Sequence, residues 1–241
     1  MKNRFYEARL LGSAYTNDRT KHFAFELANG SDFDYEPGQF IAMAAEFEGR
    51  QILRDYSIAS SPHHDNRFEL CLNIIPEGRV SAWLFGIQPG DKVEFCGPFG
   101  MFTLRQPLDP VSAFIATGTG IAPIRAMLQY LYHQPGASLA AGRELWLIFG
   151  VRGESDILYR AEFEKMARDN SGFHFIPTLS RPGGDWQGHT GYVQKQVRKY
   201  LAAKQGFHAY ICGLKKMVDD VRLELQAMGY GPKSQSYEKY D

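Results

Sequence analysis

Cysteine is scarce in this sequence of 241 residues, which contains only Cys71, Cys96 and Cys212. The number is odd and no two of them form a Cys-x-x-Cys pair, so neither a disulfide framework nor a four-cysteine zinc or iron–sulfur site within one chain is expected. The seven histidines, including the adjacent His63 and His64, lack a spacing such as His-Glu-x-x-His and are interpreted as surface or loop residues. We therefore predict no metal site, and any iron–sulfur partner should be a separate protein.

An excess of charge is also missing, because 27 basic residues balance 27 acidic ones and the net charge is zero. Bulk attraction to nucleic acid or to an anionic membrane surface is therefore not expected. No apolar run approaches the ~20 residues that a membrane span needs, and residues 1–6 lack the apolar core of a signal peptide. We expect a cytoplasmic protein, a monomer or weak dimer, that binds neither nucleic acid nor membrane.

The length allows two compact domains of roughly 100 to 140 residues each. In the first part of the chain, short segments of alternating apolar and polar residues are separated by Pro and Gly, as at 23–27, 68–74 and 92–95. This pattern is typical of an antiparallel β-barrel or sandwich, and one short helix is expected at 80–85.

After residues 106–110, short apolar strands alternate with helical stretches. The expected strands are 111–116, 145–150, 173–177 and 209–212, and the expected helices are 123–132, 158–168, 192–203 and 214–228. Such alternation predicts a parallel sheet with right-handed crossovers, whose ligands bind beyond the carboxyl ends of the strands. We therefore predict an α+β two-domain protein with an N-terminal antiparallel domain over residues 1–106 and a C-terminal α/β parallel-sheet domain over 107–241.

The segment Arg54-Asp55-Tyr56-Ser57 is suited to binding a phosphate and a ring. Arg54 offers a donor fork that fits a phosphate, Tyr56 shares its face of the strand, and Ser57 points the other way. Alone, the tetrapeptide is also compatible with an ordinary surface strand.

A second candidate phosphate site is Gly78-Arg79-Val80-Ser81, which precedes the expected short helix. Backbone N–H groups and the Ser81 hydroxyl at a helix start form a natural anion site. A glycine turn capped by a serine would have the same sequence. Together with Arg54, however, the segment provides two phosphate clamps.

A third motif, Thr117-Gly118-Thr119-Gly120-Ile121-Ala122-Pro123, follows an apolar strand and starts a helix. Glycine lets the backbone approach a ligand closely, the helix start favours a negative pyrophosphate, and Pro123 suits a first helical turn. A purely structural turn between strand and helix remains the alternative.

The order of these motifs, followed by Cys212-Gly213 and an aromatic near the end of the chain, resembles the ferredoxin-NADP reductase superfamily. The resemblance covers essentially the whole chain and is specific because the motifs span both domains. It implies a flavin-binding β-barrel followed by a nicotinamide-nucleotide-binding domain. In that family the arginine grips the flavin phosphate, the tyrosine stacks on the flavin ring, and the serine helps to relay a proton; Arg54, Tyr56 and Ser57 match these positions.

The same resemblance assigns the remaining candidates. Gly78, Arg79, Val80 and Ser81 match the loop that holds the flavin pyrophosphate, which favours FAD over FMN. Thr117, Gly118, Gly120 and Pro123 match the nicotinamide-cofactor turn. Ser180 and Arg181 resemble the clamp on an adenosine 2′-phosphate, Tyr192 an adenine-stacking tyrosine, and Arg152 a further phosphate ligand. NADPH is favoured, but NADH is possible, because Thr190-Gly191 stands where relatives place a phosphate-binding lysine.

Three catalytic candidates also follow from the resemblance. The Cys212 thiol would line the nicotinamide pocket without acting as a nucleophile, and Ser57 and Glu238 would manage a proton. Tyr240, a cofactor-binding candidate, would cover the flavin face. The chain runs one residue beyond that tyrosine. A buried, packed cysteine is the plainer reading of Cys212 and is compatible with this role.

The resemblance implies a flavin-dependent NAD(P)H oxidoreductase that passes single electrons to a separate ferredoxin, flavodoxin or oxygenase component. A free-flavin or siderophore-iron reductase is one alternative, although two phosphate clamps favour a retained FAD. The other alternative is an electron-transfer subunit of a larger complex without turnover of its own.

Overall fold

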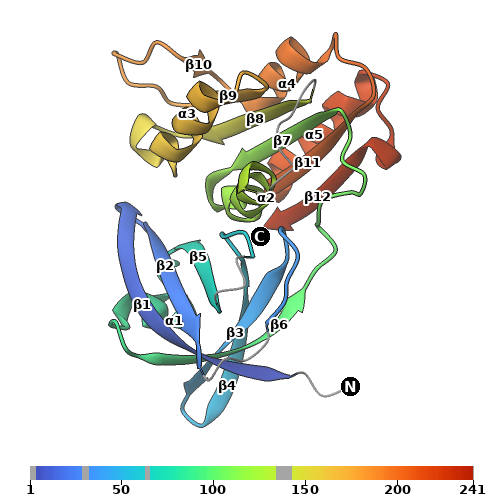
Figure 1. Ribbon diagram of the computed structural model, residues 1–241. Coiled ribbons are helices and arrows are strands. Elements are labelled where there is room, and N and C mark those ends of the chain that lie inside the picture. The colour runs from blue at the N-terminus through green and yellow to red at the C-terminus, as the bar shows by residue number, and fades with distance from the viewer. Residues whose placement is uncertain (1–3, 29–32, 63–65, 134–142, 241) are drawn as a thin grey trace.

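The computed structural model describes residues 4–28, 33–62, 66–133 and 143–240. Over these residues the chain forms two six-stranded sheets, the first in the N-terminal half and the second in the C-terminal half (Figure 1). His63 and His64, interpreted above as loop residues, lie outside the described residues. The predicted domain boundary at 106/107 falls between the last strand of the first sheet and the first strand of the second.

The first sheet is an antiparallel barrel with the strand order β4-β3-β6-β1-β2-β5. Its elements are β1 (Phe5–Asn17), β2 (Thr20–Leu27), β3 (Phe40–Phe47), β4 (Arg50–Ser57), β5 (Arg67–Asn73), α1 (Arg79–Gly86) and β6 (Lys92–Phe99). A bridge between Ile58 and Leu70 joins the two edge strands, so the sheet closes on itself. Alternate residues face inward, as the sequence pattern predicts, and the core is rich in phenylalanine.

The second sheet is parallel, with the order β10-β9-β8-β7-β11-β12. Its strands are β7 (Val111–Thr117), β8 (Glu144–Val151), β9 (Phe173–Leu179), β10 (His189–Thr190), β11 (Phe207–Leu214) and β12 (Gln235–Tyr240). Its helices are α2 (Ile121–His133), α3 (Arg160–Asp169), α4 (Val193–Leu201) and α5 (Lys215–Ala227). The central strands are apolar throughout because α2 and α3 cover one face, and α4 and α5 the other (Figure 1). The predicted fold class is therefore confirmed.

The sequence did not predict the last strand, β12. It pairs with β11 so that Glu238 lies opposite Cys212 and Tyr240 opposite Leu214. Its sequence, Gln-Ser-Tyr-Glu-Lys-Tyr, is mostly polar, so it lacks the apolar run that marks the central strands. The tertiary pairing with β11 places it in the sheet.

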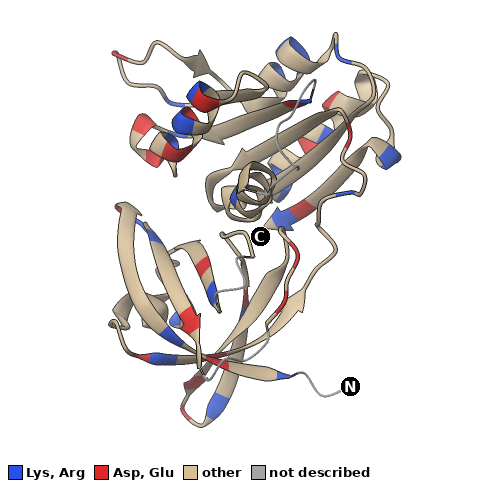
Figure 2. Ribbon diagram, viewed as in Figure 1, with Lys and Arg blue, Asp and Glu red and all other residues tan. Residues whose placement is uncertain are grey.

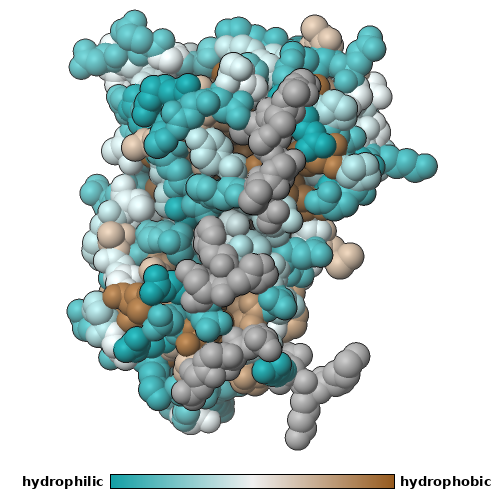
Figure 3. Space-filling view, in the orientation of Figure 1, coloured by the Kyte–Doolittle hydropathy of each residue, from teal (hydrophilic) through white to brown (hydrophobic). Residues whose placement is uncertain are grey.

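Charged residues of both signs are spread over both halves, in keeping with the zero net charge (Figure 2). On the face drawn in Figure 3, hydrophilic residues predominate and hydrophobic residues form small separate areas. Among the described helices, none is long and apolar enough to cross a membrane.

Candidate active site at the junction of the two sheets

The carboxyl end of β4 meets the carboxyl end of β12. Ser57, the last residue of β4, donates a hydrogen bond from Oγ to Glu238 Oε1 at 3.1 Å. The same Oγ lies 2.5 Å from the hydroxyl of Tyr240. Because β-strand side chains alternate, Glu238 and Tyr240 share one face of β12 and reach Ser57 together. Three predicted site residues from opposite ends of the chain thus form one polar cluster.

Burial dominates the electrostatics of this cluster. It raises the pKa of Glu238, and the charge of Asp55 adds to this effect, whereas the hydrogen bond from Ser57 opposes it. Burial also raises the pKa of Tyr240, so its phenol keeps its proton at neutral pH. The cluster therefore places, beside a serine hydroxyl, a phenol that keeps its proton and a carboxyl group that binds a proton more readily than usual.

Cys212 and the turn after β7 lie directly beside the cluster. Cys212 is completely buried, and burial raises the pKa of its thiol, so the sulfur is neutral rather than a nucleophilic thiolate. A Cβ atom placed on Gly120 would lie 2.3 Å from the Cys212 carbonyl oxygen, and one on Gly213 would lie 2.3 Å from Thr117 Oγ1. Both glycines are therefore required for the close approach of the two strand ends.

Thr117 carries an unusual hydroxyl. Its Oγ1 is buried and has no hydrogen-bond partner among the described residues. Unpaired buried polar atoms are uncommon in folded proteins because each lacks the hydrogen bonds that water would provide. The oxygen lies at the carboxyl end of β7, where parallel sheets bind ligands.

On the barrel side, Arg54 and Tyr56 lie on β4, the strand that ends at Ser57. Tyr56 is half-buried, and burial raises the pKa of its phenol to about 12. Arg54 is exposed, and its Nη1 donates to the neighbouring carbonyl of Leu53 at 2.8 Å. Both residues are two positions apart on the same strand, so they share one face, as predicted.

The loop before α1 differs from the prediction at Ser81. Its hydroxyl is not free to bind an anion, because Ser81 is buried and its Oγ accepts a hydrogen bond from the Ile75 N–H and donates to the carbonyl of Gly78, the N-cap of α1. Gly78 is packed so closely that an added Cβ would lie 2.8 Å from Ser81 Oγ. The Gly78 N–H donates to the Ile75 carbonyl at 2.8 Å, so Gly78 and Ser81 together fix the shape of the loop at the start of α1.

Arg79 and Val80 have different surroundings. The Arg79 guanidinium lies over the Phe47 ring and pairs with Glu48 at 3.3 Å, which places it beside the turn between β3 and β4. Val80 is buried in the barrel core. The chain thus brings an exposed arginine from α1 toward the same hairpin that carries Arg54.

The predicted nucleotide-specificity residues all lie at the carboxyl edge of the second sheet. The N–H of Ser180 donates to the Val151 carbonyl and that of Arg181 to the Arg152 carbonyl, both at 2.9 Å, so the loops after β8 and β9 run side by side. Both arginine side chains are exposed. Tyr192, just before α4, is 68% exposed.

Pro123 is buried in the first turn of α2, which begins two residues earlier than predicted. Gly118 adopts a left-handed φ of 54°, which glycine accommodates without strain. A cavity lined by Met101, Phe102 and residues 235–238 opens beside Glu238.

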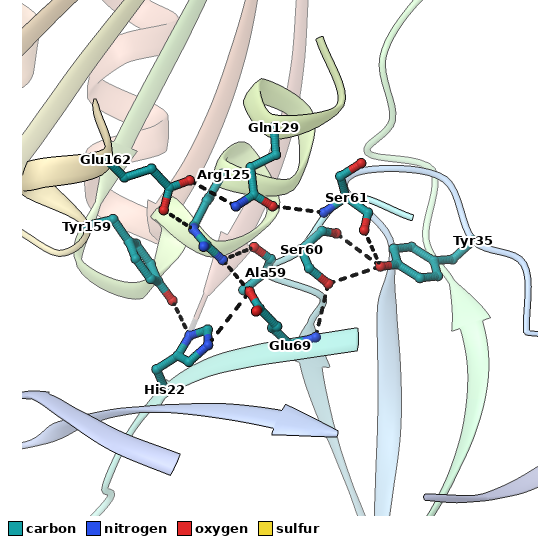
Figure 4. A network of polar contacts seen from close by, with 10 residues as sticks. All are labelled: His22, Tyr35, Ala59, Ser60, Ser61, Glu69, Arg125, Gln129, Tyr159 and Glu162. Atoms are coloured by element: carbon teal, nitrogen blue, oxygen red, sulfur yellow. Dashed lines mark hydrogen bonds and ion pairs between the residues drawn. The ribbon is translucent and has the colours of Figure 1, made fainter. Parts of the chain in front are cut away.

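Sequence reasoning missed Arg125, which crosses between the two halves (Figure 4). It projects from α2, and its side chain is only 10% exposed. Its Nη1 donates to the Ala59 carbonyl at 2.8 Å and to Glu69 Oε2 at 2.6 Å, both in the N-terminal half. A signal was present in the sequence, because an arginine within the apolar face Ile124–Leu128 must find buried partners.

Two family models match the chain. The oxidoreductase FAD-binding domain matches residues 8–104, and the oxidoreductase NAD-binding domain matches residues 114–223. The chain is 39% identical over 246 residues to ferredoxin-NADP reductase B of Sorangium cellulosum, and the match covers 98% of each protein. It is 30% identical over 203 residues to the glycine betaine monooxygenase reductase subunit of Pseudomonas aeruginosa, covering 82% of this chain but only 54% of that subunit.

Among solved structures, a ferredoxin NADP+ reductase from Neisseria gonorrhoeae with bound FAD and NADP has a similar fold. Its TM-score is 0.84 at 21% sequence identity, and the match covers 99% of each chain. The two halves and the junction between them define a two-domain oxidoreductase that uses FAD and a nicotinamide nucleotide. The chain belongs to the ferredoxin-NADP reductase superfamily, as the motifs predicted, and it is a flavin-dependent NAD(P)H oxidoreductase.

The residues at the junction fit these two cofactors. Thr117 Oγ1 is a buried hydroxyl without a partner among the described residues, and Gly120 and Gly213 allow the turn after β7 and the end of β11 to meet beside it. The exposed arginines Arg54 and Arg79 on the barrel suit the phosphates of a dinucleotide.

Proposed function

We propose that this protein oxidises NADPH through a retained FAD and delivers the electrons singly to a separate carrier protein. The observation that carries the proposal is the cluster of Ser57, Glu238 and Tyr240, in which the flavin half and the nucleotide half contribute to a single site. Hydride transfer requires two cofactors to meet, and the cluster lies where β4 of one half touches β12 of the other.

We assign the flavin-binding residues to the barrel. Arg54 would hold a phosphate through paired, charge-assisted hydrogen bonds, and the Tyr56 ring would stack on the flavin. The backbone N–H group of Arg79, at the start of α1, would hold the second phosphate, with Gly78, Val80 and Ser81 fixing the shape of the loop. In this assignment the Ser81 hydroxyl holds the loop in shape and does not bind the phosphate itself.

We assign the nicotinamide nucleotide to the second sheet. The turn of Thr117, Gly118 and Gly120, followed by Pro123 in α2, would hold the pyrophosphate at the helix start. Ser180, Arg181 and Arg152 would bind the 2′-phosphate of NADPH, and the exposed Tyr192 ring would stack on adenine. NADH remains a possible second substrate, because Thr190 and Gly191 offer no cation at the position before the tyrosine.

The bound FAD supplies the conversion of a hydride, which carries two electrons, into single electrons. Glu238, whose pKa is raised by burial, would hold a proton and exchange it with the Ser57 hydroxyl 3.1 Å away. Cys212 would form a wall of the nicotinamide pocket, a role that its neutral, buried thiol permits. Tyr240 would exclude water until the nicotinamide ring takes its place.

The electron acceptor that we propose is a ferredoxin, a flavodoxin or an oxygenase component. Sorangium ferredoxin-NADP reductase B and the Pseudomonas monooxygenase reductase subunit, by their names, support the first and the last of these classes. A cytoplasmic location, a monomeric or weakly dimeric state and a domain boundary at 106/107 remain predictions.

Anaerobic reduction of the purified protein by NADPH and NADH in parallel tests the proposal. We expect NADPH to bleach the flavin absorbance faster at limiting concentration, and the flavin released by denaturation to be FAD. Reduction by neither nucleotide would overturn the proposal. Loss of the yellow colour during extensive dialysis would favour the free-flavin reductase instead.

Nucleotide preference can be tested with Arg181→Gln. We expect the KM for NADPH to rise about tenfold, which corresponds to losing ~1.4 kcal/mol of charge-assisted binding, while the KM for NADH stays unchanged. Arg168→Gln, which changes an arginine at the end of α3, is the control. An equal effect on both nucleotides would contradict the assigned role of Arg181.

A further inference from the structure

We infer that Arg125 is a positioning residue that fixes the flavin half against the nucleotide half in the geometry needed for hydride transfer. This inference rests on the proposed function. Among the described residues, the Arg125 side chain makes no hydrogen bond to the Ser57 cluster or to the turn after β7. It lies in the helix that follows this turn, however, and its partner Ala59 is two residues beyond Ser57.

Arg125 uses its guanidinium to join three segments of chain. Nη1 binds the Ala59 carbonyl and Glu69 of β5 on the barrel side, and Nε donates to Glu162 of α3 at 2.8 Å on the nucleotide side. The guanidinium also lies over the Tyr159 ring, 4.2 Å from its centroid. One buried cation thus satisfies acceptors from both halves (Figure 4).

The two anchored segments are those that carry the proposed chemistry. Ala59 follows Ser57 by two residues on a continuous, buried stretch of chain. On the other side, α2 runs without interruption from Ile121 to His133, so Arg125 is rigidly linked to the turn that ends at Gly120. A shift of Arg125 relative to Ala59 would therefore move the turn after β7 relative to Ser57.

Two further contacts repeat the same connection. Gln129, one turn further along α2, donates to Glu162 Oε1 at 2.9 Å and accepts the N–H of Ser61 at 3.1 Å. His22 of β2 lies 2.9 Å from the Tyr159 hydroxyl, where one ring nitrogen and the phenol share a hydrogen bond. The two halves are therefore joined through three residues of the nucleotide half, Arg125, Gln129 and Tyr159.

Arginine is suited to this position in a way that lysine is not. Its planar fork directs several N–H groups to separate acceptors at once, whereas a lysine amine is a single point of charge on a flexible stem. Arg125→Lys therefore keeps the positive charge but loses simultaneous contact with Glu162 and the barrel. This makes it a conservative test of geometry rather than of charge.

The chain provides a matched control in Arg160. It also pairs with two glutamates, Glu154 and Glu164, and its guanidinium lies over the ring of Trp186. All four residues belong to the nucleotide half, so Arg160→Lys changes the same chemistry without touching the connection to the barrel. Glu69→Gln is a second test variant, because it weakens the contact from the barrel side and leaves the pair of Arg125 and Glu162 in place.

The experiment measures flavin reduction by NADPH in an anaerobic stopped flow for wild type, Arg125→Lys, Glu69→Gln and Arg160→Lys. In Arg125→Lys we expect the limiting rate constant to fall ~10- to 100-fold, because a displacement of about 1 Å can have this effect on transfer between aligned centres. Flavin content and the half-saturating NADPH concentration should stay within about threefold, because binding residues are unchanged. Glu69→Gln should show a smaller fall in the same constant, and Arg160→Lys none.

A second readout needs no cofactor. The Ser61 amide, which is bonded to Gln129 across the two halves, should exchange with deuterium at least about tenfold faster in the Arg125→Lys apoprotein, whereas β8 amides keep their protection. An unchanged Ser61 exchange, an unchanged limiting rate, or an equal fall in Arg160→Lys would each overturn the inference. If wild type is reduced by neither nucleotide, the proposed function fails, and the exchange data alone then decide whether Arg125 holds the halves together.

Discussion

The burial of Glu238 affects both the stability of the fold and the proton transfer that we propose for this residue. Its carboxyl group is withdrawn from water and has the raised pKa described above, while a single hydrogen bond from Ser57 favours the charged form. Because the folded protein holds this proton more tightly than the unfolded chain, stability decreases as the pH rises from 4.5 through the raised pKa. The group therefore lowers the stability of the fold at neutral pH, although the proposed function uses it as a proton donor.

We predict that Glu238→Gln lowers kcat by ~10²-fold, the usual effect of removing a general acid or base. In wild type, kcat should fall as the pH rises through the raised pKa of Glu238, and the variant should lack this limb of the pH profile. The free energy of unfolding at pH 7 should be equal to or higher than that of wild type. Glu94→Gln, on an exposed position of β6, is the control; a pH profile shared by wild type and Glu238→Gln would refute the role.

Gly120 shows how closely the turn after β7 approaches the carboxyl end of β11. The Cβ atom of an alanine there would meet the Cys212 carbonyl at 2.3 Å, and a backbone carbonyl cannot move aside as a flexible side chain can. We predict that Gly120→Ala lowers the free energy of unfolding by ~2 to 3 kcal/mol, in the range of overpacked cores. Urea unfolding measures this, with Gly184→Ala, which points into open space, as the control. A change below 0.5 kcal/mol, about the level of ordinary surface substitutions, would show that the turn can yield.

At the scale of elements, strand β11 has important polar contacts at both of its own ends. Its carboxyl end carries Cys212, whereas its start holds His208, which is buried between Arg105 and Ser236 with ring nitrogens 3.0 and 2.9 Å from their polar atoms. Burial, and then the charge of Arg105, lowers the pKa of His208 to about 4. The segment that joins the two halves is thereby fastened to the sheet by a neutral histidine.

This gives a prediction for the acid stability of β11. Since the unfolded histidine titrates near 6.5 and the folded one near 4, the unfolded state binds more protons between these values, and stability falls as the pH drops through that window. The loss amounts to about 3.5 kcal/mol at most, at ~1.4 kcal/mol per pH unit. His208→Gln should be less stable at pH 7 but should flatten the slope of unfolding free energy between pH 6.5 and 4. An unchanged slope would show that other groups cause it.

The elements differ in how far the sequence determines them. The central strands and helices were predictable because their apolar periodicity is strong, and the predicted ends agree with those observed to within a few residues. The edge strand β12 was not, since its pairing with β11 depends on tertiary contacts. The motifs of Ser57 and Thr117 indicated the junction, but the inward turn of the Ser81 hydroxyl and the partners of Arg125 depend on side-chain directions that sequence spacing does not encode.

At the scale of the whole molecule, the connection between the halves includes a titratable group. Burial alone would raise the pKa of Glu69, but its hydrogen bond to His22 and the charge of Arg125 lower it to about 2. A depressed carboxyl pKa stabilises the fold above 4.5, and this stabilisation is lost as the pH falls toward 2. Acid should therefore weaken the contact between the halves as well as each half by itself.

We predict that Glu69→Gln lowers the free energy of unfolding at pH 7 by about 1 to 2 kcal/mol, after allowing for the partial exposure of the carboxylate. The difference from wild type should shrink as the pH approaches 2, because protonation removes the same charge. Chemical denaturation at pH 7, 4 and 3 measures it. Glu7→Gln, which removes a surface pair with Lys92, is the control and should change the free energy by less than 0.5 kcal/mol. A difference that is constant with pH would contradict the linkage.

The alternation of side chains along β12 has a last consequence. Glu238 and Tyr240 reach the serine at the end of β4, while Lys239 between them pairs with Asp219 of α5 at 2.7 Å. One residue inserted between α5 and β12 would exchange odd and even positions, so that Tyr237 takes the place of Glu238 and the Lys239 ammonium group takes the place of the Tyr240 phenol. Whether the site presents a proton donor or a fixed positive charge is thus set by the parity of a loop length, so insertions of two residues there should be tolerated better than insertions of one.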